Sequence, residues 1–367
     1  MTRARELANL AGVSETALSN RNLILNGSMQ VAQRSSSFAT SVSTGYHTVD
    51  RIKIQGNASV GQWTSSQDSD APSGFTKSFK LDCTTADTSL GTTDHFGFAY
   101  LPEGFHMDSV GKGTSGAKPM TLSFYLKATV IKTMVVELAD AGNSRHVNFA
   151  VTPSATNTWE RVTLSIPADT SGSFNQGTNS KAAELNFWLG AGTNYTTGST
   201  QATWVARTAA NIMAGVSNWA DSTSNAIWIT GVQLEIGEQA TPFEHARSYG
   251  EELAACQRYY YRLHGSSTSF VAIGSGVLHA ADRPRIYHKY PKAMRVAPTI
   301  TISTGTDIDL RANDGSTVDV SGLDTVWAGK ESAMIELNLD SNLTAGRGLI
   351  IHTENDSASF IQGDAEL

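Results

Sequence analysis

The sequence has little charge, few cysteines and no long apolar run. Only 17% of the 367 residues are charged. The two cysteines, Cys83 and Cys256, do not form a closely spaced pair in the sequence such as the C-x-x-C motif of metal sites. No apolar stretch is long enough to cross a bilayer. The first twenty residues include Arg3, Arg5 and Glu6 and lack the apolar core of a signal peptide. We therefore expect a protein that is made and folded in a cytoplasm, without membrane insertion.

Catalytic motifs are also missing. The sequence contains no G-x-S-x-G, H-E-x-x-H, P-loop or G-x-G-x-x-G motif, and its nine histidines do not cluster at ligand spacing. A glycosidase pair of carboxylates is defined by a distance in space, which the sequence does not give. We expect no enzyme activity and no cofactor. A structural calcium stays open, because carboxylates gather around two loops at Asp68, Asp70, Asp82, Asp87 and Asp94.

The N-terminal segment, residues 1–21, resembles a DNA-binding element only in part. ELANLAGVSETALSN is similar to the first two helices of a LacI-type helix-turn-helix, which needs a third helix. Instead, Asn22 begins the strand-like NLILNG, and the net charge of −7 disfavours phosphate binding. We expect no nucleic-acid partner. The segment is interpreted as a short helical peg for attachment, with Leu7 and Leu10 on one side.

Alternating apolar and polar residues dominate the rest of the chain. Met120, Leu122, Phe124 and Leu126 alternate with polar neighbours, and many similar short runs are separated by turn-rich loops. This pattern predicts an all-β protein, with a jelly-roll β-sandwich over residues 22–240. A second, smaller β domain is predicted over residues 264–367.

The segment between these domains changes its period. Residues 227–236 read as a strand that Gly231 interrupts like a bulge. Tyr249, Leu253, Cys256 and Tyr260 then fall on one face of a helix, so residues 241–263 are predicted to be a connector helix. This face has two open interpretations: it packs on its own sandwich, or it lines a threefold axis between subunits. Cys83 and Cys256 both lie on apolar faces, which favours buried thiols, although a disulfide is not excluded.

Several blocks of the sequence resemble a known family. ITGVQLEIG, TPFEH, RSYGEEL and CQRYYY, with the opening NLILNGSMQVAQR and the closing DAEL, resemble virion proteins of tailed bacteriophages, especially tail-fibre-like proteins of marine phages. The resemblance covers Asn22 to Leu367; one departure is Ile52, where family members often have an aromatic residue. It implies a jelly roll like those of carbohydrate-binding modules, a homotrimer, other phage virion proteins as partners, and a place in the virion after assembly in the host cytoplasm.

Aromatic residues fall on the outward face of several predicted strands. If Leu185, Phe187 and Leu189 face the core, then Glu184, Asn186 and Trp188 face outward; the same parity turns Tyr125 and Trp228 outward. Exposed rings beside amides and carboxylates are typical of sugar recognition. The competing interpretation, which we favour, is that a neighbouring subunit or loop covers these rings.

The combined prediction is a virion structural protein, a tail fibre or tail appendage that contributes to recognition of a host surface glycan. Alternatives are a capsid decoration or head fibre protein, and a polysaccharide-degrading enzyme or its binding module. A basic run is ambiguous in the same way: it could contact an acidic glycan, or form the solvent face of one strand. Its residues are Arg283, Arg285, Lys289, Lys292 and Arg295.

Overall fold

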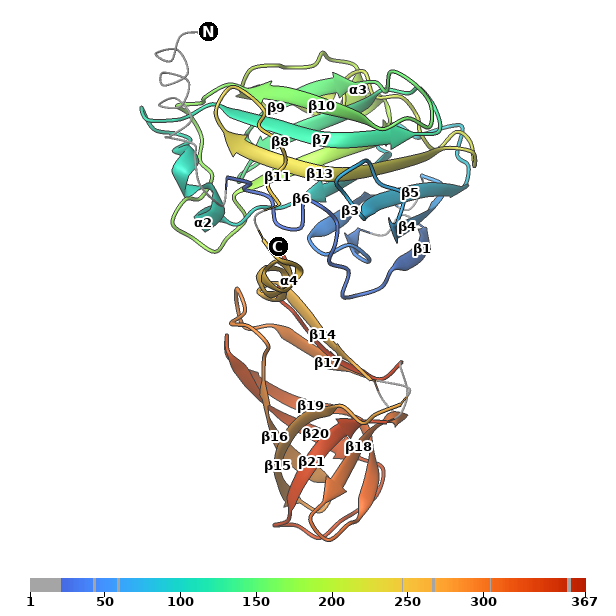
Figure 1. Ribbon diagram of the computed structural model, residues 1–367, viewed down its shortest axis with the longest axis vertical. Helices are drawn as coiled ribbons and strands as arrows, with labels where there is room; N and C mark the ends of the chain where they lie inside the picture. Colours follow the sequence, from blue (N-terminus) through green and yellow to red (C-terminus); the bar gives the residue numbers. More distant parts are fainter. Residues whose placement is uncertain are drawn as a thin grey trace. The chain divides into compact units, whose positions relative to one another are not determined.

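The computed structural model of the chain describes residues 21–41, 44–57, 60–245, 247–265, 268–303, 305–354 and 358–367 (Figure 1). Leu7 and Leu10, and with them the predicted peg, lie outside the described residues. Contacts divide the chain into two compact units, one ending at Glu252 and the other formed by Leu253–Glu366. The division falls inside the predicted connector. No helix in the described ranges is long and apolar enough to cross a membrane.

The first unit is a sandwich of two antiparallel sheets, as predicted. The six-stranded sheet has the order β1 (Ser37–Ser41), β4 (Gln62–Asp68), β5 (Ser78–Thr85), β13 (Ala226–Ile236), β7 (Met120–Ala128) and β10 (Glu160–Ile166). The seven-stranded sheet has the order β12 (Val205–Ala206), β9 (Arg145–Val151), β8 (Met134–Asp140), β11 (Ala183–Ala191), β6 (His95–Tyr100), β3 (Ile52–Gly56) and β2 (Gly45–Tyr46). Short helical turns interrupt the loops: α2 (Gly104–Met107), η1 (Asp108–Val110), α3 (Thr193–Thr196) and η2 (Ala209–Asn211).

Aromatic rings from both sheets form the centre of the sandwich core. Phe98 on β6 stacks on Phe187 of β11 at 4.8 Å and meets Phe79 of β5 edge-on at 5.1 Å. Phe124 of β7 meets Phe187 edge-on at 5.4 Å. All four are almost fully buried. Two of these three ring pairs, Phe98–Phe79 and Phe124–Phe187, join the two sheets. The cluster therefore fixes how the sheets pack.

The predicted bulge at Gly231 is confirmed. The register between β13 and β7 shifts between Thr230 and Gln233, and Gly231 has a φ of 61°, which L-residues rarely adopt. A Cβ atom at this position would lie 2.7 Å from Phe75 and 2.9 Å from Tyr125. The glycine is therefore required both by the backbone conformation and by the rings that cover it.

We expect Gly231→Ala to lower the free energy of unfolding of the sandwich by about 1–3 kcal/mol, from the left-handed backbone and the ring overlap. Urea denaturation measures the change. Gly250→Ala is the matched control, because an added Cβ there meets nothing within 4 Å. A variant at Gly231 as stable as the wild type would contradict this explanation of the bulge.

The predicted connector helix is shorter than expected. Helix α4 spans Tyr249–Gln257, and strand β14 follows at Tyr260–His264. The placement of Tyr260 on a helix face is therefore wrong: it lies in β14, and its hydroxyl donates to Gln362 at 2.6 Å. Tyr249 is exposed, Leu253 is half-buried and Cys256 is buried. Cys83 and Cys256 are both buried thiols and do not form a disulfide.

In the described residues that follow α4, every regular element of the second unit is a β-strand, which confirms the predicted C-terminal β domain. Three strands form a small sheet in the order β14, β22 (Phe360–Asp364) and β17 (Thr299–Ile302). Six strands close a barrel in the order β15 (Ala272–Ala280), β16 (Arg283–Lys289), β20 (Ser332–Leu339), β19 (Thr317–Ala328), β18 (Gly305–Ala312) and β21 (Gly348–Thr353). A turn at Asn313-Asp314-Gly315 joins β18 to β19.

The barrel interior determines which residues of β16 face outward. Ile286 and His288 are buried, and His288 donates from Nδ1 to the carbonyl of Ile273 at 2.8 Å. Its Nε2 therefore accepts from the hydroxyl of Tyr261 at 2.9 Å. Side chains alternate between the two faces of a strand. Because Ile286 and His288 face the barrel interior, Arg285 and Tyr287 face solvent.

Candidate functional site

Three of the five predicted sugar-binding residues, Asn186, Trp188 and Trp228, are buried. Asn186 and Trp188 lie on the outer face of the seven-stranded sheet, as parity predicts, but are only 0% and 3% exposed. Trp188 packs with Val135, Ile212 and Met213, so the segment around η2 covers it. The expectation of exposed rings is wrong here, and the competing interpretation of a covering loop is correct for Trp188.

Beneath this cover, a buried carboxylate organises the polar side chains. Glu137 of β8 is fully buried and lies opposite Asn186 in the sheet. It accepts hydrogen bonds from His146 Nδ1 at 2.8 Å, Arg207 Nε at 2.7 Å, Trp188 Nε1 at 3.0 Å and Asn186 Nδ2 at 3.1 Å. Burial alone would raise the pKa of Glu137, but the hydrogen bonds from His146 and Arg207 and the Arg207 charge hold it at about 2. The carboxylate is therefore ionised and its bonding capacity is filled, which makes this network structural.

Glu184, also predicted to bind sugar, is similarly engaged. Its carboxylate accepts from Lys181 and from Asn143 Nδ2, the latter at 3.1 Å. Burial raises its pKa, but the bonds from Lys181 and Asn143 hold it below its usual value. The side chain of Glu184 is only 15% exposed, so little of its carboxylate is open to a ligand.

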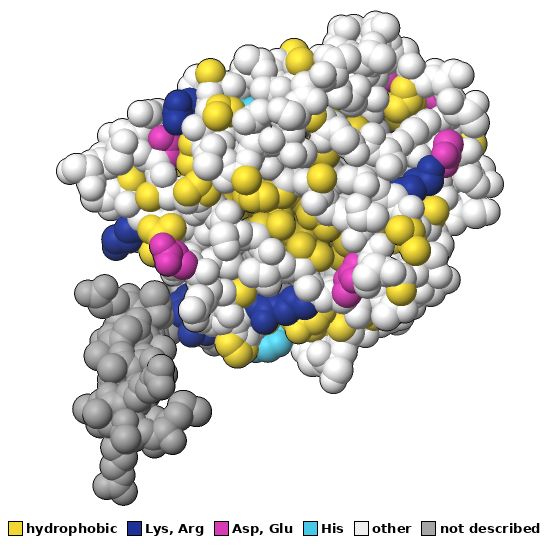
Figure 2. All heavy atoms as spheres, turned by 90° about the horizontal axis from the view of Figure 1, so that it is seen from above, with side chains coloured by type: hydrophobic (Ala, Val, Ile, Leu, Met, Phe, Trp, Pro, Cys, Tyr) yellow, Lys and Arg dark blue, Asp and Glu magenta, His cyan; other side chains and the backbone are white. Residues whose placement is uncertain are grey.

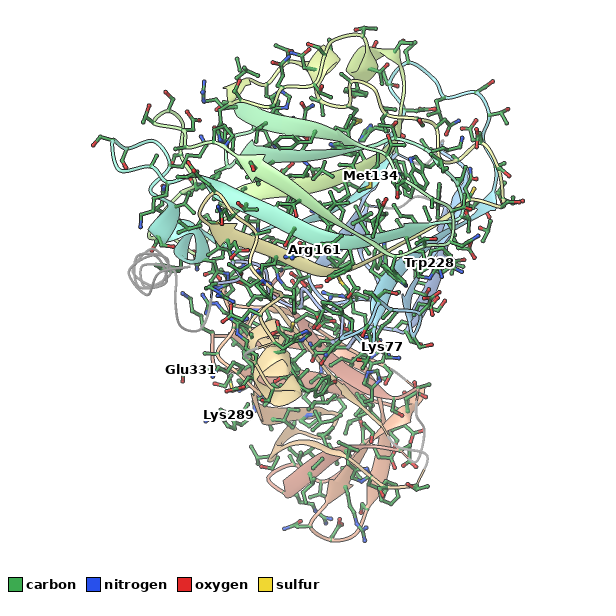
Figure 3. The ribbon with its side chains drawn as sticks, turned by 45° about the horizontal axis from the view of Figure 1, so that its top comes forward. Lys77, Met134, Arg161, Trp228, Lys289 and Glu331 are labelled. Carbon is green, nitrogen blue, oxygen red and sulfur yellow. The ribbon has the colours of Figure 1, made fainter. Side chains whose placement is uncertain are left out.

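Tyr125 and Trp228 lie on the outer face of the six-stranded sheet (Trp228 is labelled in Figure 3). Trp228 is only 8% exposed, because Lys80 and Lys127 place their ammonium groups 5.0 and 5.1 Å from the centre of its ring. Its Nε1 donates to Asp68 at 3.0 Å. Tyr125 is half-buried against Phe75, with the ring centres 5.3 Å apart. The expectation of an exposed ring is therefore also wrong for Trp228, and Tyr125 is partly covered by Phe75 from the loop before β5.

The aspartates considered for calcium are engaged separately. Asp68 accepts from Trp228, Asp70 from Lys127 and Trp159, and Asp82 from Lys80. Asp87 accepts from the Ser89 amide, and Asp94 from Asn57 and the Gly91 amide. Within the described ranges, no group of three or more His, Cys, Asp or Glu side chains is placed to hold a metal ion. Charged side chains are also sparse and scattered on the face of the sandwich shown in Figure 2.

Three exposed large apolar side chains gather on the barrel. Tyr287 on β16 is 58% exposed, Met334 on β20 is 43% exposed and Trp327 on β19 is 46% exposed. Tyr287 pairs directly with Met334, and Met334 pairs with Trp327, so the three form one row across adjacent strands. We call the outer surface of these strands the β16–β20–β19 face; Lys289, at its edge, is labelled in Figure 3.

Charged groups accompany the rings on this face. The next row pairs Arg285 with Glu336, which form an ion pair, and the Arg285 guanidinium lies 5.5 Å from the centre of the Trp327 ring. Arg283 forms an ion pair with Asp324. Arg283, Arg285 and Lys289 thus alternate with buried residues of β16, which confirms the interpretation as the solvent face of a strand for these three residues. Lys292 and Arg295 lie beyond the end of β16, and Arg295 donates to the backbone carbonyls of Ala365 and Glu366. The arrangement places exposed flat apolar surfaces beside charged hydrogen-bonding groups, a combination that is typical of sugar recognition.

Sequence reasoning missed the rings of this face for a physical reason. Tyr287 lies between Arg285 and Lys289 at an outward position of β16, so parity could have identified it. Trp327 could not be placed, because the register of β19 against β20 shifts twice before it, between Val320 and Gly322 and again between Leu323 and Thr325.

A carboxyl cluster elsewhere on the barrel predicts an unusual pH dependence. Asp309 of β18 lies opposite Asp319 and is 7% exposed; burial and hydrogen bonds with Glu354 and Asp319 raise its pKa to about 8. The folded barrel therefore holds a proton that the unfolded chain releases, so stability falls as the pH rises from about 4 to about 8. We expect Asp309→Asn to remove this fall and to raise the melting temperature at pH 8. An unchanged pH profile in thermal denaturation would contradict the expectation.

Comparisons with known proteins give only distant similarities. No family model matches the sequence, and no curated protein matches it. The enzymatically active domain of tailspike protein 4 of bacteriophage CBA120 is 14% identical, with a TM-score of 0.31, over 59% of this chain and 22% of that one. The family 11 carbohydrate-binding module of a cellulosomal cellulase of Clostridium thermocellum is 10% identical, with a TM-score of 0.27, over 60% and 97%. The CBM22-1 xylan-binding domain of Xyn10C from Paenibacillus barcinonensis is 10% identical, with a TM-score of 0.26, over 57% and 100%.

This chain therefore spans less than a quarter of the tailspike domain that it resembles. The jelly-roll sandwich and the barrel are established by the strand order and pairing of this chain itself.

Proposed function

We propose that this protein is a structural protein of a tailed-phage virion, a tail fibre or similar appendage, that contributes to host recognition by binding a surface glycan. The observation that carries the glycan part is the β16–β20–β19 face, with Tyr287 and Trp327 about half exposed beside two ion pairs. A soluble protein rarely leaves large rings this open in one row unless a partner covers them. The virion part rests on the sequence blocks that resemble phage proteins.

The glycan is proposed to stack on the rings and to hydrogen-bond to the charged groups. The apolar C–H face of a sugar ring fits a flat aromatic ring, and its hydroxyl groups can donate to Glu336 and accept from Arg285. The sandwich would then act as the body of the particle component. Assembly as a homotrimer, with other virion proteins as partners, belongs to the same proposal.

The test is binding of the labelled full-length protein to intact host cells, with periodate-treated cells alongside. Periodate cleaves vicinal diols of sugars and leaves surface proteins largely intact. We expect binding to untreated cells and its loss after treatment. Binding that survives periodate would overturn glycan recognition, and absence of binding to untreated cells would favour a decoration role within the particle.

A further inference from the structure

We infer that the β16–β20–β19 face takes an uncharged, extended polysaccharide chain that lies across the strands and stacks on Tyr287 and Trp327. This inference rests on the proposed glycan-binding function and adds the ligand's charge, shape and direction. Three observations carry it: side chains that bridge over β20, the spacing of the two rings, and the balance of charges around them.

Side chains from β16 and β19 meet over the strand between them. The Arg285 guanidinium on β16 lies over the Trp327 ring on β19, with 5.5 Å between them. Arg283 on β16 likewise forms an ion pair with Asp324 on β19. Both contacts pass over β20. The outer side chains of the three strands therefore form one continuous surface on the barrel.

The spacing of the rings suits a chain longer than one sugar. Tyr287 on β16 and Trp327 on β19 lie in the same row, on either side of β20. Two steps of the usual separation between strands place them about 10 Å apart. Sugars that are two units apart in an extended chain present the same face at a comparable interval. Each ring can therefore stack on one of them, while Met334 packs under the sugar between.

The charges on this face compensate one another. Three cations, Arg283, Arg285 and Lys289, are matched in number by three carboxylates, those of Asp282, Asp324 and Glu336. Arg283 forms an ion pair with Asp324 and lies 3.9 Å from Asp282, and Arg285 forms an ion pair with Glu336. A polyanionic glycan would need an excess of positive charge, which is absent from the described residues of this face. Neutral hydroxyl groups, in contrast, can share the hydrogen bonds of both members of an ion pair.

The inference is tested with the polysaccharide released from host cells, separated by anion exchange into an uncharged and an acidic fraction. Native gels that contain either fraction measure retardation of the full-length protein. We expect retardation by the uncharged fraction, unchanged between about 0.05 and 0.5 M salt because screening weakens only charge attraction. Tyr287→Ala and Trp327→Ala should each weaken it about tenfold, and Phe105→Ala, which changes an exposed ring of the sandwich, should not.

Fragments of the uncharged fraction test the geometry. Because the rings are two sugars apart, fragments of fewer than about three sugars should bind far more weakly than longer ones. The inference would be overturned if only the acidic fraction, or neither fraction, retarded the protein. It would also be overturned if Tyr287→Ala and Trp327→Ala were both retarded as strongly as the wild type. The periodate experiment reports on the proposed function separately, because it requires no particular glycan charge or binding face.

Discussion

Replacing Glu137 with alanine is expected to lower the free energy of unfolding of the sandwich by about 3–5 kcal/mol. The substitution removes the acceptor of His146, Arg207, Trp188 and Asn186 together. It leaves the Arg207 guanidinium, whose side chain is only 17% exposed, without its carboxylate partner. Removing one member of a buried ion pair costs more than the pair itself contributes, because the remaining charge stays desolvated.

Chemical denaturation of the full-length protein, followed by tryptophan fluorescence, measures this change. Glu238→Ala is the matched control, because Glu238 is exposed on the same unit and its removal should change stability by less than about 0.5 kcal/mol. Equal stability of the two variants would show that the Glu137 network contributes nothing to the sandwich.

Glu137 also predicts how the sandwich responds to acid. Its pKa is about 2 in the folded protein, below the ordinary value of 4.5. A depressed carboxyl pKa contributes stability that is fully present above pH 4.5 and is lost as the pH falls toward 2. Glu137→Gln should flatten this part of the stability profile, whereas a profile as steep as that of the wild type would assign the acid sensitivity to other groups.

Replacing Phe98 with alanine should have an effect of similar size, about 3–5 kcal/mol. Phe98 is 1% exposed and contacts Phe79 in the opposite sheet and Phe187 in its own. Its removal opens a cavity between the sheets, which packed side chains refill only partly, and removes two aromatic pairs worth about 0.5–1.5 kcal/mol each beyond their buried area.

The contrast with Phe105 isolates the effect of burial. Phe105 is 52% exposed on α2, so Phe105→Ala removes the same ring without opening a cavity, and it should change stability by less than about 0.5 kcal/mol. Urea denaturation of both variants measures the difference. A Phe98 variant that unfolds at the same urea concentration as the Phe105 variant would contradict the assignment of the aromatic cluster as the centre of the core.

The strand pattern was predictable because alternation in the sequence directly reflects the two faces of a sheet. Leu185, Phe187 and Leu189 are buried as their parity predicts, and Gly231 marks the bulge. Burial of the outward residues was not predictable in the same way. Ile212 and Met213, which cover Trp188, are more than twenty positions away in the sequence, and no local pattern records such a contact.

The site on the barrel was hidden for two further reasons. A ring can be assigned to the outer face of a strand only where the strand register is known. The two register shifts in β19 prevent this assignment for Trp327 from the sequence. Tyr260 shows the opposite error, because its spacing fits a helical face while pairing with β22 places it in a strand. Tertiary pairing overrides a short periodic pattern in such cases.

The most direct test of the account compares two variants in host-cell binding: the double variant Tyr287→Ala/Trp327→Ala on the barrel and Trp228→Ala on the sandwich. Since each exposed ring is expected to contribute about tenfold, the double variant should lose about a hundredfold in affinity for untreated cells, with its melting temperature retained. Trp228→Ala, whose ring lies between two lysines, should bind like the wild type. If instead the double variant binds normally and Trp228→Ala does not, the β16–β20–β19 face is not the binding site.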